Sequence, residues 1–134
     1  MVKINRVYTG GGDDGESSLV DGSRRRKSDP RFSVVGTCDE ANSWLGMVLA
    51  EINRVPDHED GGERTSVQRV QTVLNEALAR VQNELFDLGA ELACPPEALP
   101  EYMVLLSQGQ TDVLMAEMDA WLTTLPELTS FILP

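Results

Sequence analysis

The sequence predicts an all-α fold, an up-down bundle of three long helices behind a glycine-rich N-terminal loop or short hairpin. Three observations predict this architecture. Apolar residues recur at alternating spacings of three and four in three long segments. Proline follows each of these segments, and no segment shows the period-two alternation of a strand. A chain of 134 residues is long enough to bury the core of one domain.

The N-terminal segment is dominated by glycine, with Gly10, Gly11, Gly12 and Gly15 inside six positions. Glycine loses the most backbone entropy on ordering, so this segment is neither helix nor strand interior. Its exposed backbone N–H groups suit a phosphate chain. A basic run at 24–27 follows in a chain whose net charge is −11. The glycine loop and the basic run together predict a polyanion site, with a nucleoside triphosphate as the expected ligand.

Other interpretations of the glycine segment fit less well. A flexible leader has the same composition and stays open at this point. A Walker A loop is excluded because no Gly-Lys-Ser/Thr follows, and no strand and helix flank the segment as a dinucleotide fingerprint requires. A calcium loop built on Asp13, Asp14 and Glu16 lacks alternating oxygen ligands and a closing glutamate.

The first helix is expected to begin at Thr37. The run Thr-Cys-Asp-Glu at 37–40 has the form of a capping box, in which Thr37 and Glu40 satisfy the first free amides. Pro56 ends this helix, and a polar loop occupies 56–65. One apolar face follows the helical repeat. Its members are Ala41, Leu45, Val48, Ile52 and Val55.

The second and third helices are expected over 67–92 and 108–124. Apolar residues keep a three-four alternation along 67–92, which suits packing between helices. Pro95 and Pro96 end that segment, and Pro126 ends the third. Three helices bury only a shallow core, so we expect further chain or neighbouring subunits to cover their apolar faces.

Composition narrows the classes of partner. A net charge of −11 disfavours binding to nucleic acid. No apolar window in the sequence reaches the length of a membrane span. One histidine and two cysteines argue against a zinc or haem site, so no metal is expected on protein ligands. No secretory signal is evident, and a cytoplasmic location is the default expectation.

Four motifs in register give the chain a resemblance to a known family. They are Tyr-Thr-Gly-Gly-Gly-Asp-Asp-Gly at 8–15 with Ser-Ser-Leu at 17–19, Lys-Ser-Asp-Pro-Arg at 27–31 with Gly-Thr-Cys-Asp-Glu at 36–40, Leu-Phe-Asp-Leu-Gly-Ala-Glu-Leu-Ala at 85–93, and Ser-Phe-Ile-Leu-Pro at 130–134. Over nearly its whole length the chain resembles the PduO-type ATP:cob(I)alamin adenosyltransferases, or corrinoid adenosyltransferases.

The resemblance implies transfer of the 5′-deoxyadenosyl group from ATP to cob(I)alamin, giving adenosylcobalamin and triphosphate. It implies ATP with Mg²⁺, cobalamin as a substrate, and a five-helix bundle assembled as a homotrimer with active sites between subunits. Residues 1–35 are then the ATP-binding segment and 36–134 the helical bundle of a single domain. In the family an arginine-rich helix follows the position of Pro134, so the chain resembles a C-terminally truncated member. The alternative is a non-catalytic bundle that binds ATP or cobalamin.

The resemblance also assigns site residues. The expected ATP-binding residues are Thr9, Gly10, Gly11, Gly12, Asp13, Gly15, Ser17, Ser18 and Lys27. Lys27 is the candidate for direct contact with the triphosphate. Mg²⁺ is expected on the phosphates rather than in a protein cage.

The expected catalytic residues are Phe131 and Asp39. An aromatic at the position of Phe131 displaces the lower axial base of the corrinoid in the family, which eases reduction of the cobalt; the alternative is that Phe131 is a core residue. Asp39 pairs with an arginine of the neighbouring subunit in the family, or merely compensates the helix dipole. Phe86 is expected either in the core or in the cobalamin pocket.

Overall fold

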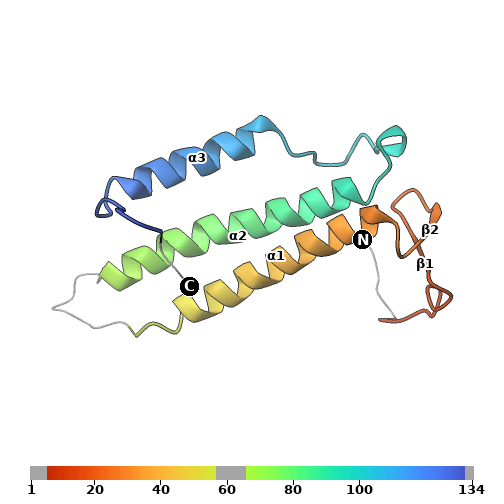
Figure 1. Cartoon of the computed structure of the whole chain (residues 1–134), viewed down its shortest axis with the longest axis horizontal. Coiled ribbons are helices and arrows are strands. Elements are labelled where there is room, and N and C mark those ends of the chain that lie inside the picture. Colours follow the sequence, from red (N-terminus) through yellow and green to blue (C-terminus); the bar gives the residue numbers. More distant parts are fainter. Residues whose placement is uncertain (1–5, 57–65, 132–134) are drawn as a thin grey trace.

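The computed structural model describes residues 6–56 and 66–131. A short antiparallel hairpin of β1 (Glu16–Ser18) and β2 (Arg24–Arg26) precedes three helices, α1 (Pro30–Ile52), α2 (Ser66–Leu92) and α3 (Gln108–Leu122). A 3₁₀ turn at Pro96–Ala98 lies between α2 and α3. The helices run up, down and up beside one another, with the hairpin at one end (Figure 1). The predicted helical bundle and its three long helices are confirmed.

Helix α1 begins at Pro30, so the predicted start at Thr37 is wrong. The Asp29 carboxylate caps the helix by accepting from the Arg31 amide at 2.9 Å. Pro30 occupies the first helical turn, where its missing N–H costs no hydrogen bond. The Thr37 hydroxyl donates to the carbonyl of Ser33 inside the helix instead. Asp39 therefore lies well inside α1, and its interpretation as a dipole-compensating acid of the first turn is also wrong.

Helices α1 and α2 form the main packed pair, joined by reciprocal amide hydrogen bonds. The side chain of Asn42 donates to the carbonyl of Gln82 at 3.0 Å, and Gln82 donates back to the carbonyl of Asn42 at 3.1 Å. At the C-terminal end of α1, the side-chain amides of Asn53 and Asn75 donate to each other's side-chain oxygens. Such paired amides fix the register of two antiparallel helices because a slip would leave both donors unpaired.

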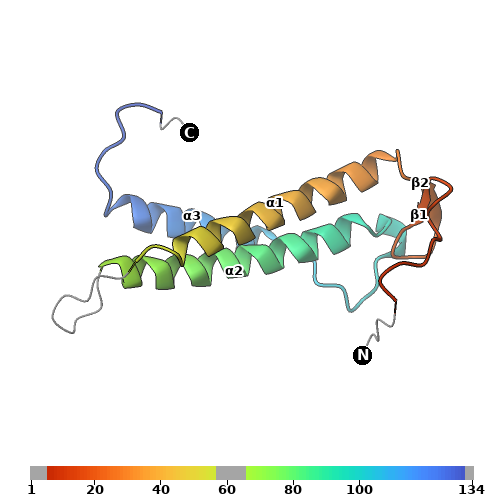
Figure 2. The same cartoon turned by 90° about the horizontal axis from the view of Figure 1, so that it is seen from below.

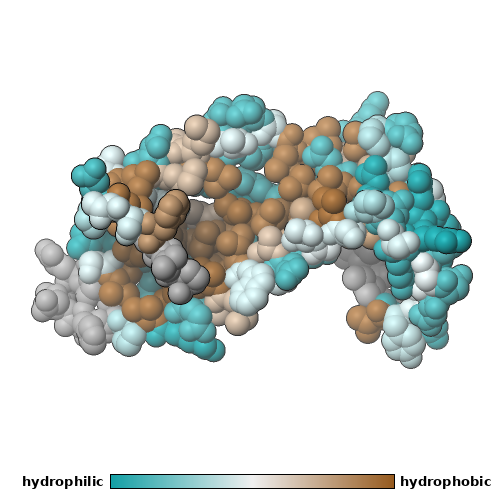
Figure 3. All heavy atoms as spheres, viewed as in Figure 1, coloured by the Kyte–Doolittle hydropathy of each residue, from teal (hydrophilic) through white to brown (hydrophobic). Residues whose placement is uncertain are grey.

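The helices leave much apolar surface uncovered. Within the described residues, the buried hydrophobic side chains are only Leu19, Ala77 and Cys94. Leu45 and Ile52 are half-buried as predicted, but Val48 and Val55 of the same predicted face are exposed. Figure 3 shows apolar side chains spread over the exposed middle of the molecule. The expectation of a shallow core is confirmed.

Helix α3 starts at a capping box formed by Ser107 and Gln110. An ion pair between Arg80 of α2 and Glu117 of α3 links the two helices, and Arg80 also pairs with Glu84 at 2.9 Å. The predicted bounds of the second and third helices agree with α2 and α3 to within two residues. The loop expected at 56–65 lies almost wholly outside the described residues. No helix in the described part of the chain is long and apolar enough to cross a bilayer.

Candidate functional site: a glycine-loop hairpin at the end of the helices

The glycine segment folds into two successive turns just before β1. The amide of Asp13 donates to the Gly10 carbonyl, and the amide of Gly15 donates to the Gly12 carbonyl, both at 3.2 Å. Gly10 and Gly15 have φ of +70° and +87°, a conformation that side chains strongly disfavour. The amides of the remaining loop residues donate to no described residue and so are free to meet an anion. These are Gly10, Gly11, Gly12 and Asp14.

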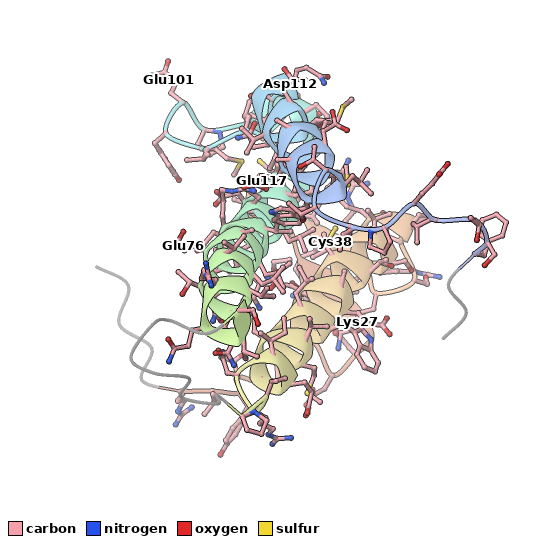
Figure 4. The ribbon with its side chains drawn as sticks, turned by 90° about the vertical axis from the view of Figure 1, so that its left-hand side faces the viewer. Lys27, Cys38, Glu76, Glu101, Asp112 and Glu117 are labelled. Atoms are coloured by element: carbon pink, nitrogen blue, oxygen red, sulfur yellow. The ribbon has the colours of Figure 1, made fainter. Side chains whose placement is uncertain are left out.

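Lys27 returns to the glycine loop after β2. Its amide donates to the Gly15 carbonyl at 2.9 Å, and its side chain lies against Gly12, where a Cβ atom would sit 3.2 Å from Lys27 Nζ. The ammonium group forms no ion pair with any described residue. Acidic side chains on α2, α3 and the segment between them lie away from it (Figure 4). The labelled ones are Glu76, Glu101, Asp112 and Glu117. The structure thus brings an unpaired cation and the glycine loop together.

Arg24 contacts the same glycine loop through its guanidinium group. Its guanidinium donates to the Gly11 carbonyl at 2.6 Å and to the Ser18 hydroxyl at 3.3 Å. It also lies 3.6 Å from the Asp14 carboxylate and 3.7 Å from that of Glu16. Exposed ion pairs of this kind contribute little energy, but they neutralise two acids that would repel phosphate. The basic run was visible in the sequence, whereas this role depends on the hairpin register, which sets Arg24 opposite Ser18.

The hydroxyls assigned to ATP binding differ in availability. The Ser18 hydroxyl accepts from Arg24, while the hydroxyls of Thr9 and Ser17 bond to no described residue. Thr9 is exposed beside Gly11, and Ser17 is half-buried in β1. The Asp13 carboxylate lies beside Gly10 and forms no ion pair with the residues described. The side chains of Thr9 and Asp13 therefore form no hydrogen bond or ion pair with the described residues and are available to a ligand.

A tight turn closes the hairpin between its two strands. The amide of Gly22 donates to the Leu19 carbonyl, and Gly22 has φ of +82°. The Asp21 carboxylate accepts from both the hydroxyl and the amide of Ser23. These hydrogen bonds, the hydroxyl first, hold the pKa of Asp21 below its ordinary value. Local hydrogen bonds thus order the turn between β1 and β2. An ordered turn keeps the two strands, and the glycine loop before them, in a fixed arrangement.

The hairpin is attached where α1 begins and α2 ends. Leu19 is buried, and the amide of Val20 donates to the carbonyl of Ala93 at 3.0 Å. The Arg31 guanidinium donates to the carbonyls of Leu92 at 2.6 Å and Cys94 at 3.2 Å. Sequence inspection missed Arg31 as an anchor because its partners lie more than sixty positions away. The Asp-Pro pair before it, a common helix start, was the available signal.

The other predicted site residues lie outside this cluster. The Asp39 carboxylate is exposed on α1 and forms no ion pair within the described chain. Phe86 is 69% exposed on α2 and Phe131 is 94% exposed, so neither is a core residue of the chain as described. The segment that carries Phe131 lies at the opposite end of the molecule from the hairpin (Figures 1 and 2). Within one chain, the segment after α3 therefore lies away from the hairpin.

An apolar cavity of about 420 Å³ lies between α2 and the end of α3, lined by Val70, Val73, Leu74 and Trp121 among others. Its lining carries no catalytic constellation. In residues 6–56 and 66–131, no three His, Cys, Asp or Glu side chains converge as a protein-held metal would need.

Comparison with known proteins places this geometry in a family. A sequence model described as cobalamin adenosyltransferase matches residues 7–134. The chain belongs to the cobalamin adenosyltransferase family. The recognition made from the four motifs is confirmed, and so is the assignment of the helical bundle to this family's fold.

Relatives in the family are similar over nearly the whole of this chain but are longer. The chain is 37% identical over 134 residues to the corrinoid adenosyltransferase of Mycobacterium tuberculosis, covering 99% of this chain and 61% of that protein. It is 36% identical over 129 residues to that of Bacillus subtilis, covering 96% and 58%. Human corrinoid adenosyltransferase MMAB is 32% identical over 136 residues, covering 98% and 48%. The chain thus spans about three fifths of the length of its bacterial relatives.

Solved family structures agree with the fold. A variant of the PduO-type ATP:corrinoid adenosyltransferase from Lactobacillus reuteri complexed with ATP superposes with a TM-score of 0.73 at 29% identity, over 96% of this chain and 62% of that one. A second variant, complexed with cobalamin and ATP, gives 0.72 at 26% identity, over 96% and 63%.

Proposed function

We propose that this chain carries the ATP-binding part of a corrinoid adenosyltransferase, which moves the 5′-deoxyadenosyl group of ATP onto cob(I)alamin. One observation carries the proposal for this chain's own residues. The unpaired ammonium of Lys27 lies against a loop with four free amides, at Gly10, Gly11, Gly12 and Asp14. Cations and unpaired backbone amides are the groups that bind a triphosphate. Membership of the family supports the same activity.

The reaction needs orientation and charge stabilisation more than acid–base chemistry. The reduced cobalt of the substrate attacks C5′ of ATP, a cobalt–carbon bond forms, and the C5′–oxygen bond breaks. Triphosphate departs with the bonding electron pair, and no proton moves at the carbon. Fixed donors near the leaving oxygens lower the barrier because negative charge grows there. Lys27 and the free loop amides fill this role without a histidine or a cysteine.

Mg²⁺ fits this site as a companion of the phosphates. The carboxylates of Asp14 and Glu16 are paired with Arg24, which leaves Asp13 as the unpaired acid of the loop. Mg²⁺ keeps several waters and favours phosphate oxygens with one or two carboxylates. Asp13 would hold its water shell, and the bound ion would supply further neutralisation of the triphosphate.

The separation of the two ends of the chain supports a site between subunits. The hairpin and the segment that follows α3 lie toward opposite ends of one chain, so a pocket that uses both would join two chains (Figures 1 and 2). The unpaired carboxylate of Asp39 is exposed on α1, as an intersubunit ion pair with an arginine requires. Trp44 and Met47, exposed by 64% and 57%, offer apolar surface for packing between subunits. We propose a homotrimer in the cytoplasm, where ATP and a reduced corrinoid meet.

The decisive experiment combines binding and transfer. The full chain is mixed with ATP, Mg²⁺ and chemically reduced cobalamin, and the visible spectrum is followed for a light-sensitive cobalt–carbon product. Formation of that product supports the proposal. ATP binding without product favours the alternative, a non-catalytic bundle that only binds its ligands. No ATP-dependent protection of residues 8–31 from protease refutes both.

A further inference from the structure

We infer that Arg31 is a positioning residue, which holds the glycine-loop hairpin at a fixed place on the helices without touching ATP. The inference rests on the proposed function, since it concerns how that site is aligned. Arg31 differs from the basic run at 24–27 in its surroundings. Its side chain is half-buried and donates to two backbone carbonyls, whereas Lys27 is exposed and unpaired.

The partners of Arg31 explain why its charge is not offered to a phosphate. Leu92 is the last residue of α2, and the carbonyls at a helix C-terminus have no partner within the helix and carry partial negative charge. Arg31 satisfies the carbonyls of Leu92 and Cys94 from one guanidinium nitrogen. Cys94, only 2% exposed, lies at this junction. The guanidinium thus links the first turn of α1 to the end of α2.

This link controls the hairpin because the chain around it is short. Arg31 lies two residues after the Asp29 cap, and the Lys27 amide, two residues before that cap, donates to the Gly15 carbonyl of the loop. The second attachment of the hairpin to α2 is the bond from Val20 to Ala93. Without the Arg31 side chain, the hairpin keeps its internal turns and its bond to Lys27. It can then rotate about its remaining hydrogen bond to α2, from Val20 to Ala93.

Such a pivot separates binding from chemistry. The proposed phosphate donors, the amides within 10–14 and Lys27, flank the two strands and move with the hairpin, so ATP still binds. The ribose carbon, however, moves relative to a corrinoid docked on the helices, and a misplacement of about 1 Å costs on the order of a hundredfold in rate. Loss of Arg31 should therefore lower kcat and leave ATP affinity nearly unchanged.

The test compares Arg31→Gln and Arg31→Lys with Arg80→Gln in the full chain. Arg80 is also half-buried and links two helices, but it lies between α2 and α3. For Arg31→Gln we expect kcat to fall about 10- to 100-fold. The Kd for ATP should change less than about threefold, a small effect on the affinity scale. Arg31→Lys should recover part of the rate because lysine still reaches one carbonyl.

A second readout does not depend on catalysis. Without ATP, trypsin should cut within 24–27 at least several-fold faster in Arg31→Gln than in the wild type, and at the wild-type rate in Arg80→Gln. A rise in the ATP Kd as large as the fall in kcat would overturn the inference, because Arg31 would then bind ATP. Equal cleavage rates in Arg31→Gln and the wild type would overturn it too. If the wild type transfers no adenosyl group, the proposed activity fails, and the cleavage rates still decide whether Arg31 anchors the hairpin.

Discussion

The side chain of Lys27 occupies the space that a side chain on Gly12 would need. A Cβ atom at position 12 would lie 3.2 Å from Lys27 Nζ and 2.9 Å from the carbonyl oxygen of Glu16. The backbone contact is the harder constraint, since a carbonyl in β1 cannot yield without distorting the hairpin. Glycine at position 12 is thus what allows the loop and the cation to share one site.

Gly12→Ala should weaken ATP binding because the added methyl group displaces either Lys27 or the first strand. We expect the affinity to fall about tenfold, or about 1.4 kcal/mol. Gly11→Ala is the matched control, since its Cβ would meet only the Thr9 hydroxyl oxygen at an ordinary 3.7 Å. Calorimetric titration with Mg-ATP measures both, and equal affinities in the two variants would contradict the assignment.

Lys27→Ala should weaken ATP binding and leave cobalamin binding nearly unchanged. A hydrogen bond to a charged group contributes about 1.5–3 kcal/mol, so we expect a loss of about 10- to 100-fold. Arg26→Ala is the control, because it removes the same charge from an exposed cation one position away. Titrations with each ligand provide the measurement. Equal losses for ATP and cobalamin would refute the direct contact.

Arg24→Gln should loosen the loop and leave the carboxylates of Asp14 and Glu16 unpaired beside the phosphates. ATP affinity should fall several-fold, and more at low salt because these charges are exposed and screened by ions. The double variant Arg24→Gln with Glu16→Gln should regain part of the loss, since one repelling charge is gone. Salt-dependent titrations test this. An absence of recovery would mean that Arg24 does not act by neutralising Glu16.

Phe131→Ala should leave ATP affinity intact and slow the transfer, because the ring is proposed to act on the corrinoid. Leu128→Ala is the control, an exposed apolar residue of the same segment. Single-turnover spectra with reduced cobalamin give the rate. A rate equal to that of the wild type would exclude the proposed role.

Glu117→Gln should destabilise the chain by about 1 kcal/mol, because a partly buried ion pair between α2 and α3 is lost. Glu51→Gln serves as the comparison, since the Glu51–Arg54 pair is exposed and lies within one helical turn. That change should cost less than about 0.5 kcal/mol. Urea unfolding measures both, and equal costs would mean that the link between α2 and α3 adds nothing.

Local signals explain what sequence reading achieved and where it failed. The three-four repeat along α2 is carried by neighbouring residues, so its bounds were predicted closely. The start of α1 was misplaced because two start signals compete, Asp29-Pro30 and the Thr37 box. Either signal can start a helix. The helix begins at the earlier one because no proline lies between Pro30 and Thr37 to interrupt it.

By itself the sequence determined the three helices, the glycine loop with its nearby cations, and the family. These follow from spacing and residue type along a short stretch of chain. Only the tertiary structure decided that Lys27 lies on Gly12, that Arg31 joins α1 to the end of α2, and that Phe86 and Phe131 face outward. Each of these depends on which distant residues meet in space, and the spacing of residues along the chain does not contain that information.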